Sequence, residues 1–584
     1  MKKILVWAKQ YRSLLEILLA ALLAFGLLMT IKPAPSGYVI YVLAFIALLM
    51  LVKKGLRYYN KRRGWFAAFF AVPFGLAFWL GQKVIYQSVE LRPMQVFDLV
   101  SIATIVFVAW LTFLVIVGLI DEYAMKVGRN KVTLFKNRGW LKASVIIFLC
   151  WLPLFLVYFP GIVSVDSAVQ LRQAIGEGGW SNWHPVVHTA FVAIPVNLGM
   201  NMFGDLTAGI ALSTLVQMGV LATIFGYVVK WMTTKTSRKW LGVCALLVFG
   251  LFPVIACYSV TMWKDVLFAA CFLLLIINVC DLVMRYRRSE KLGTKDLVKM
   301  GCIAVCVGFL RNGGVLIIAM LGIAMLIWYK KMRKQLAVGV IVLVAGVAIV
   351  QGPLYGAMGI QASPFVESMS VPVQQLAYVL HTSDLTDDER DKLSKYADVE
   401  CLRLNYAPMN ADPAKNCFNY DAVNEDKMGL INVWLDVMKG HLGGYVKAYI
   451  LHTYGYWYVQ ADNWILDFGH THDDIWLSED YTDKSLLGEG VKSKVTQFEN
   501  GFVASPYLGW LNNTGCLFWG MVFMLIVFLY QKKYYMLVPM SCVLIYMISL
   551  LVASPVSWIF RYVYCLLLIL PIFVLMSLIR KEKK

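Results

Sequence analysis

The stretch that decides the fold reads Tyr158-Phe-Pro-Gly-Ile-Val-Ser-Val-Asp-Ser167 and continues through Asn182-Trp-His-Pro-Val-Val-His188. An apolar run over 143–157 precedes it, and a second apolar run begins at His188. The polar residues between the two runs would lie at the edge of a membrane, where they cost free energy unless they are paired or used. We therefore interpret the loop 160–186 as the floor of an active site that the rest of the chain positions.

The composition of the whole chain predicts a membrane protein. Of its 584 residues 60% are hydrophobic and only 15% are charged, and the mean hydropathy is +0.66. Apolar runs of about 17–25 residues, the length that crosses a bilayer core, recur along the sequence. The run over 13–31 is too long for a signal peptide and has no small-residue cleavage site, so we expect a retained first span. The predicted fold class is an all-α polytopic membrane protein.

The basic residues predict topology rather than a nucleic-acid partner. The formal net charge is +19, but Lys and Arg are concentrated in short loops between the apolar runs, as the positive-inside rule expects of cytoplasmic loops. No nucleic-acid-binding motif accompanies them. These basic loops are 53–63, 126–142, 230–239, 285–299, 330–334 and 580–584.

Placing those loops inside gives about fourteen crossings of a bacterial plasma membrane, with both termini cytoplasmic. The stretch 188–230 is ambiguous because Asn201-Met-Phe-Gly-Asp205 interrupts it. Only one net crossing here keeps the later basic loops inside, so we expect 188–203 to be interfacial or re-entrant. The predicted spans lie near 13–31, 37–53, 65–86, 97–120, 142–159, 240–257, 265–284, 297–313, 314–329, 335–352, 509–530, 534–553 and 559–579, with one further crossing before 230.

The predicted domains follow from this pattern. They are four N-terminal spans over 1–125, a transmembrane catalytic module over 140–352, an extracellular soluble domain of mixed or α-rich structure over 353–508, and C-terminal spans over 509–584. The soluble domain carries 22 acidic and 11 basic residues, the reverse of the whole chain. Thr386 and Glu389 have the spacing of a capping box, which predicts the start of a helix.

Two of the twelve cysteines, Cys401 and Cys417, fall in this polar segment, whereas the other ten lie in or beside predicted spans. Because the outer side of the membrane is oxidising, we predict a disulfide between them. Cysteines in spans usually behave as small apolar residues.

With this topology, several polar side chains collect at the outer ends of spans. Basic residues are scarce on this side by the positive-inside rule, so their presence here needs a reason. A bound anionic group, such as the phosphate of a lipid, would supply one. The residues concerned are Asp166, His184, His188, Lys264, Asp265, Arg311, Asn312, Arg561 and Tyr562.

Each of these residues also has a purely structural interpretation. Asp166 would cap a short helix that Gly176 ends, and Asp265 would complement the dipole of the helix that it opens. Lys264 would extend to lipid headgroups, and Arg311 and Arg561 would pair with acidic residues or ordinary anionic lipids. His184 would be a hydrogen-bonded structural histidine.

Two further groups of residues lie later in the soluble domain. The run His470-Thr-His-Asp-Asp474 has the residue types of a metal site or is a polar surface loop. Four aromatic residues are either core or a platform for the sugar rings of an acceptor, and we expect acceptor contact. These are Tyr454, Tyr456, Trp457 and Trp464.

The order of these motifs resembles the GT-C superfamily of polytopic glycosyltransferases that use polyprenyl-phosphate sugars, such as protein O-mannosyltransferases and the lipid A aminoarabinose transferase. More narrowly, it is similar to a mainly Gram-positive family of uncharacterised GT-C-like proteins. The motifs are Pro160-Gly-Ile-Val-Ser-Val-Asp166, Asn182-Trp-His-Pro185, Trp263-Lys-Asp265, Arg311-Asn-Gly313, Ser370-Val-Pro-Val-Gln-Gln375, Tyr454-Gly-Tyr456 and Arg561-Tyr562.

The resemblance implies transfer of a sugar from a polyprenyl phosphate, such as undecaprenyl phosphate, to a cell-envelope glycan, polymer or lipid on the outer face. Cell wall polysaccharide and teichoic acid are acceptors of this kind, and membrane lipids surround the site. The first-loop Asp of those enzymes acts as general base or orients the acceptor, a role that maps onto Asp166. O-mannosyltransferases have Asp-Glu where this chain has Asp166-Ser167, so Asp265 or His184 are alternative partners of the base.

The resemblance also suggests how the donor is held. Lys264, Arg311 and Arg561 would bind its phosphate, assisted by Asn312, Tyr562 and His188. A divalent cation, Mg²⁺ or Mn²⁺, near Asp166 and Asp265 is an open alternative. Two other functions remain open: a transporter or flippase of a lipid-linked saccharide, and another envelope-modifying enzyme such as an acyltransferase.

Overall fold

The computed structural model describes residues 12–30, 38–85, 89–125, 132–135, 138–290, 292–466, 481, 483–505 and 507–580. Ten helices in these ranges are long and apolar enough to cross a membrane, and a pair bent by 57° at Phe252 makes up to eleven. Three shorter apolar helices accompany them: Ser13–Leu28, Gly314–Trp328 and Thr514–Tyr530. The chain is therefore a helical multi-pass membrane protein, whereas the count of fourteen crossings stays a prediction. The helix Val186–Phe203, expected to be interfacial, is also long enough to span.

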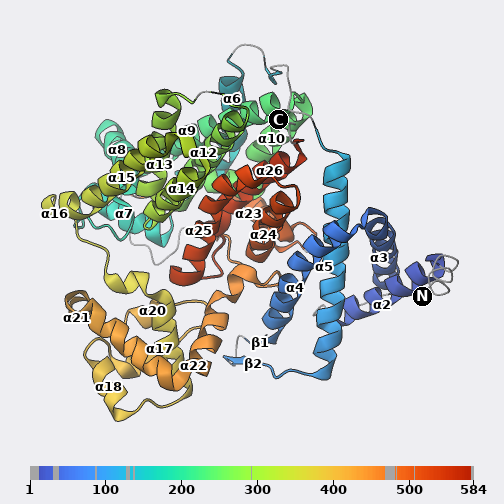
Figure 1. The fold of residues 1–584 in the computed structure, drawn as a ribbon. Helices are drawn as coiled ribbons and strands as arrows, with labels where there is room; N and C mark the ends of the chain where they lie inside the picture. The colour runs from blue at the N-terminus through green and yellow to red at the C-terminus, as the bar shows by residue number, and fades with distance from the viewer. Residues whose placement is uncertain are drawn as a thin grey trace.

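The N-terminal helices form a group beside the main bundle, drawn in dark to light blue in Figure 1. The group contains a short hairpin of two antiparallel strands and joins the main bundle through aromatic rings. Phe70 contacts Phe523 and Phe74 contacts Trp519, each with ring centroids 5.3 Å apart. Its elements are α2 (Arg12–Thr30), α3 (Tyr38–Tyr58), α4 (Lys61–Lys83), β1 (Val84–Ile85), β2 (Glu90–Leu91) and α5 (Val96–Glu122).

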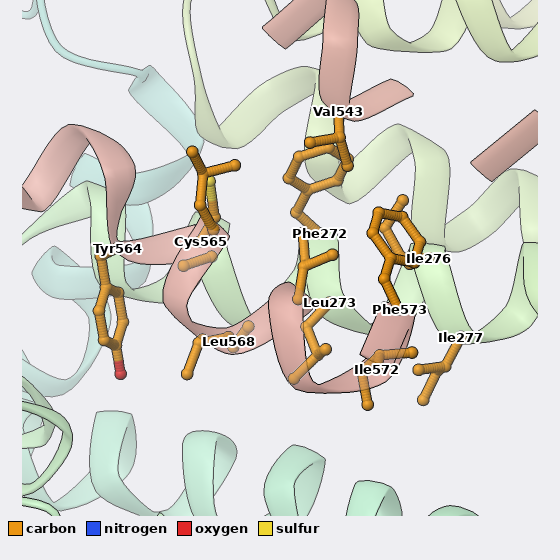
Figure 2. Close-up of a cluster of buried hydrophobic side chains, with 14 of the residues drawn as sticks. Phe272, Leu273, Ile276, Ile277, Val543, Tyr564, Cys565, Leu568, Ile572 and Phe573 are labelled. Carbon is orange, nitrogen blue, oxygen red and sulfur yellow. The ribbon is translucent and has the colours of Figure 1, made fainter. Parts of the chain in front are cut away.

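The main bundle is built around one central helix, α12 (Lys264–Arg287), which is buried along most of its length. Its apolar side chains pack against α25 and α26 in a cluster that includes Phe272, Ile276 and Phe573 (Figure 2). The other helices of the bundle are α6 (Gly139–Val157), α8 (Val186–Phe203), α9 (Leu206–Thr236), α10 (Lys239–Leu251), α11 (Pro253–Ser259), α13 (Thr294–Leu310), α14 (Gly314–Trp328), α15 (Arg333–Ile349), α24 (Thr514–Tyr530), α25 (Leu537–Ala553) and α26 (Tyr564–Leu578).

Short elements connect these helices. The α-helical ones are α7 (Val165–Ile175), α16 (Tyr355–Ala357) and α23 (Glu489–Ala504). The others are η2 (Lys330–Met332), η3 (Val350–Leu354), η4 (Phe365–Ser368), η5 (Gly509–Asn512), η6 (Tyr534–Met536) and η7 (Phe560–Val563).

A separate helical domain with its own apolar core lies at the end of the bundle away from the C-terminus (Figure 1). The helix expected at Thr386 is present, with its capping box. No strand occurs in the described part of this domain, so it is helical rather than mixed. Its helices are α17 (Ser370–Thr382), α18 (Asp387–Ser394), α19 (Val399–Leu404), α20 (Asp412–Lys415), α21 (Tyr420–Glu425) and α22 (Lys427–Trp457).

The helical domain covers only part of the predicted range 353–508. Ile465 and Leu466, which follow α22, are buried in the core of the main bundle rather than in the domain. Val495 and Val503 of α23 also pack against that core. Composition alone did not separate these segments, because they are as polar on average as the domain itself.

The structure joins Cys401 to Cys417 in a disulfide within this domain. Chain-entropy arguments give such a loop of about 15 residues about 3 kcal/mol of stabilisation. We predict that replacing both cysteines by Ser lowers the unfolding free energy of the domain by about that amount, measured by denaturant unfolding of the full chain. Cys302→Ser, at an exposed free cysteine, is the control and should change little. Two free thiols at 401 and 417 in the native protein, detected by labelling, would contradict the prediction.

Candidate active site

The first-loop motif is held beside the start of α12 by backbone hydrogen bonds. Ile162 N–H donates to Val260 O at 2.9 Å, and Met262 N–H donates to Ile162 O at 3.0 Å. Gly161 precedes this pairing with φ of +132°, and a Cβ there would lie 2.3 Å from the Thr214 hydroxyl. Glycine is therefore required at 161, because an L side chain would face both strain and a clash.

Asp166 lies in the first turn of α7. The helix cap is Ser164, whose side chain exchanges hydrogen bonds with Ser167 in a capping box. Asp166 is thus not the cap, and its carboxylate is left for other partners. Trp263 Nε1–H donates to the Ser164 hydroxyl and ties this turn to α12. Gly176 ends α7 in the left-handed conformation, as the sequence predicted.

Side chains from three other segments join Asp166 in one chain of alternating charges. Lys264 and Asp265 are the first two residues of α12, Arg311 ends α13, and Arg561 lies in η7 before α26. The order is Lys264, Asp166, Arg561, Asp265, Arg311, with a cation at each end.

The distances along this chain are those of ion pairs. Asp166 Oδ2 lies 3.4 Å from Lys264 Nζ and 2.9 Å from Arg561 Nη1. Asp265 Oδ2 lies 3.9 Å from Arg561 Nε, and Asp265 Oδ1 lies 2.6 Å from Arg311 Nη1. The three cations and two carboxylates leave one positive charge uncompensated within the chain.

The two carboxylates differ in their access to solvent. The Asp166 side chain is 24% exposed, whereas that of Asp265 is 2% exposed. Burial raises the pKa of Asp166, but Arg561 and Lys264 outweigh that effect and hold the pKa well below its usual range. Asp265 is enclosed between two arginines, so its position favours a role in placing them, and its role as an alternative partner of the base stays a prediction.

His184 contacts Lys264, whose Nζ donates to His184 Nδ1 at 2.7 Å. An ammonium group only donates, so Nδ1 is the acceptor and the ring proton is on Nε2. Burial together with the Lys264 charge lowers the pKa of His184 to about 3. In this arrangement the only lone pair of the neutral ring is already taken, so His184 does not itself accept a proton, and its role as an alternative partner of the base stays a prediction. Nε2–H can instead donate to a substrate oxygen.

His188 is fully buried in the first turn of α8. Its Nδ1 lies 3.1 Å from Gln170 Oε1, and Gln170 Nε2 donates to the Thr189 hydroxyl at 3.0 Å. Gln170 Oε1 therefore accepts from Nδ1–H, which leaves Nε2 as an acceptor without a partner among the described residues. This histidine positions α7 against α8, and its contact with the phosphate stays a prediction.

Aromatic rings surround the two arginines. The Arg311 guanidinium lies 5.0 Å from the centroid of Tyr546 and 5.5 Å from that of Tyr562. Arg561 lies 5.0 Å from the centroid of Trp263 and 5.2 Å from that of Tyr562. Cation–π contacts of this kind are worth more when the cation is desolvated. Tyr562 thus holds both arginines with its ring face.

The loop that carries His184 is fixed from two other sides. Asn312 Nδ2 donates to the carbonyls of Asn182 and Trp183 at 3.2 and 3.1 Å. Asn182 N–H donates to Gln361 O at 2.7 Å. Asn312 therefore positions this loop, and its part in binding the phosphate stays a prediction.

The aromatic residues of the predicted acceptor platform are largely structural. Tyr456 is 2% exposed and its hydroxyl contacts Ser554 Oγ at 2.5 Å, while Tyr454 is 8% exposed. Trp457 packs against the bundle core. Sugar rings cannot stack on buried rings, so the prediction does not fit Tyr454 and Tyr456. Trp464 lies nearer the site, 5.9 Å from Trp263 between ring centroids.

The segment that carries these aromatic residues nevertheless supports the backbone of the site. A Cβ on Gly455 would lie 2.6 Å from Ser557 O, so α22 packs directly on the segment that leads to η7. Trp464 N–H donates to Trp558 O and Phe560 N–H donates to Trp464 O, both at 2.9 Å. The end of the helical domain thereby fixes the backbone next to Arg561.

The charged residues do not fit a divalent cation. No group of three or more His, Cys, Asp or Glu side chains is arranged to hold a metal ion within the described ranges. His470 and His472 lie outside those ranges. Both carboxylates of the chain are already bound by arginine, and its uncompensated charge is positive. A positive site repels a cation and attracts an anion.

Sequence reasoning missed Glu499, a buried acid close to the first loop. It lies in α23, and the Tyr158 hydroxyl donates to Glu499 Oε2 at 2.6 Å. Burial raises the pKa of Glu499 to about 7. Tyr158 directly precedes the first-loop motif, so this contact fastens α23 to the start of the loop. No spacing or composition signal marks one glutamate of an amphipathic helix as buried.

We predict that Glu499→Gln makes the protein less sensitive to pH. In the folded wild type Glu499 keeps its proton up to about pH 7, whereas in the unfolded chain it loses the proton near its usual pKa of about 4.3. The wild type therefore loses stability as pH rises through that interval. At pH 8 the variant should have the higher melting temperature, and at pH 4.5 the two should be nearly equal. Parallel melting curves of the two proteins across this range would contradict the prediction.

Comparisons with curated proteins and with solved structures find no match. A family model, described as a family of unknown function (DUF6020), matches residues 177–584. The matched region contains His184, Lys264, Asp265, Arg311 and Arg561, whereas Asp166 precedes it. Because this region covers more than half of the sequence, the chain belongs to the DUF6020 family.

Proposed function

We propose that the protein is a membrane glycosyltransferase that moves a sugar from a polyprenyl phosphate to a cell-envelope glycan, polymer or lipid at the outer face of the plasma membrane. The observation that carries this proposal is the alternating charge chain from Lys264 to Arg311. It joins the ends of four separate segments beside the membrane-spanning helices, and one positive charge in it is uncompensated.

The charge of the chain matches that of the donor. A polyprenyl-phosphate-linked sugar is a phosphodiester with one negative charge, and its lipid tail keeps that charge near the bilayer. Arg561 and Lys264 offer charge-assisted hydrogen bonds, which are about twice as strong as neutral ones. The departing monoester carries more negative charge than the diester, so the same cations stabilise the charge that develops during transfer.

The chemistry is a single displacement. The acceptor hydroxyl oxygen forms a bond with the anomeric carbon, and the bond from that carbon to the phosphate oxygen breaks. The phosphate keeps the bonding electron pair and leaves as polyprenyl phosphate. Asp166, the exposed carboxylate of the chain, takes the hydroxyl proton. One displacement inverts the anomeric configuration.

The test uses the full chain in lipid nanodiscs with undecaprenyl-phosphate-linked glucose, galactose and N-acetylglucosamine as probes. With an extract of envelope polymers as acceptor, we expect protein-dependent release of undecaprenyl phosphate and labelling of the polymer. In proteoliposomes, movement of the intact lipid-linked sugars across the bilayer without their cleavage would show a flippase instead. Cleavage of none of the three probes would contradict the proposal.

A further inference from the structure

The contact between Asp166 and its two cations bears on when Asp166 can accept a proton. Both Lys264 Nζ and Arg561 Nη1 approach the same atom, Asp166 Oδ2, at 3.4 and 2.9 Å. The cations are partly accessible, with side-chain exposures of 19% and 10%. Asp166 is the more exposed of the two carboxylates, whereas Asp265 is enclosed. The accessible part of the charge chain is therefore the Asp166 side chain, one oxygen of which is shared by two cations.

We propose that the Asp166 carboxylate occupies the place of the donor phosphate in the free protein, and that the arriving phosphate takes over Arg561 and Lys264 and releases Asp166 to act as the base. This inference rests on the proposed function. Carboxylate and phosphate oxygens accept the same charge-assisted hydrogen bonds from Arg and Lys. The N–H groups of Lys264 and Arg561 that point at Asp166 Oδ2 cannot point at a phosphate at the same time.

The exchange explains how Asp166, a weak base in the free protein, becomes basic enough to act. A carboxylate held by two cations is a weak base, because proton uptake would break both contacts. Once the phosphate has taken the cations, the carboxylate regains its ordinary affinity for a proton. Asp166 then becomes competent only when a donor is present, so the donor binds before the acceptor is activated.

Asp265 and Arg311, at the other end of the charge chain, keep their positions during this exchange. Asp265 is buried and lies 2.6 Å from Arg311, and it also approaches Arg561 Nε at 3.9 Å. Arg561 Nε faces Asp265 Oδ2 at ion-pair distance without a hydrogen bond, while Nη1 faces Asp166. Arg561 can thus change its partner at Nη1 without leaving its position, which makes Asp265 a positioning residue.

The experiment measures binding of undecaprenyl phosphate, without a sugar, to the full chain in nanodiscs. Asp166→Asn removes the competing charge and keeps the side-chain shape, so we expect binding roughly tenfold tighter than in wild type, the effect of one charged hydrogen bond. Glu177→Gln is the matched control. It makes the same charge change on an exposed side chain of the same loop, and its affinity should equal that of wild type.

The outcomes separate this inference from the proposed function. Tighter binding by Asp166→Asn alone supports the exchange. Equal or weaker binding by that variant, with wild type still binding, overturns the exchange and leaves the proposed function standing. If wild type itself does not bind undecaprenyl phosphate, both fall. Asp166→Ser, which also lacks the carboxylate, gives the same comparison if the Asn variant does not fold.

Discussion

Asp166→Asn is expected to abolish sugar transfer, lowering kcat by about 10²–10⁴-fold, the usual contribution of a positioned base. The amide cannot accept the acceptor's proton, although it fits the same space and can still accept a hydrogen bond from Arg561. The measurement is turnover of the undecaprenyl-phosphate-linked sugar that the wild type cleaves, at saturating donor and acceptor.

Glu177→Gln serves as the control for the charge change and should keep wild-type turnover, because Glu177 is exposed and lies beyond the end of α7. A melting curve of Asp166→Asn shows whether the fold survives. Near-normal turnover by a folded Asp166→Asn protein would place the base elsewhere. Neither of two nearby groups can take its place in this structure, because the lone pair of His184 accepts from Lys264 and Asp265 is enclosed.

Asp265→Ala is expected to destabilise the protein by about 3–5 kcal/mol, the typical cost of removing one partner of a buried ion pair. The substitution leaves Arg311 among aromatic rings with its charge uncompensated, and it also removes the Arg561 Nε contact. The measurement is the unfolding free energy of the full chain in one detergent, by chemical denaturation.

Lys235→Ala is the control. Lys235 Nζ lies 2.8 Å from Asp281 Oδ1 of the same helix, α12, in a partly exposed ion pair, and its removal leaves the hydrogen bond that Trp231 Nε1 donates to Asp281 in place. Partly exposed pairs contribute about 1 kcal/mol or less. If the two substitutions cost the same, Asp265 does not hold the charge chain together.

The two predictions concern different measured quantities, turnover for Asp166 and stability for Asp265. Asp166→Asn should affect turnover far more than stability, since its carboxylate lies at the accessible end of α7. Asp265→Ala should affect stability first. Such a split would show that one carboxylate serves the reaction and the other holds the cations.

The sequence alone determined the class of the protein and the identity of the charged residues. Repeated apolar runs can be buried only in a bilayer, and the chain is indeed a helical multi-pass protein. Asp166, Lys264, Asp265, Arg311 and Arg561 could be named because a charge at the end of an apolar run is costly without a partner. The disulfide between Cys401 and Cys417 followed from the predicted topology, which places both cysteines on the oxidising side of the membrane.

Only the tertiary structure decided which charge meets which. Residues 166 and 561 are far apart in sequence, so no local pattern could show that Arg561 binds both carboxylates. Burial was equally hidden: the rings of Tyr454 and Tyr456 were expected to contact an acceptor but lie in a core, and no pattern marked Glu499 as buried. Pairing and burial depend on how whole helices pack, because each is set by contacts between segments that the sequence lists separately.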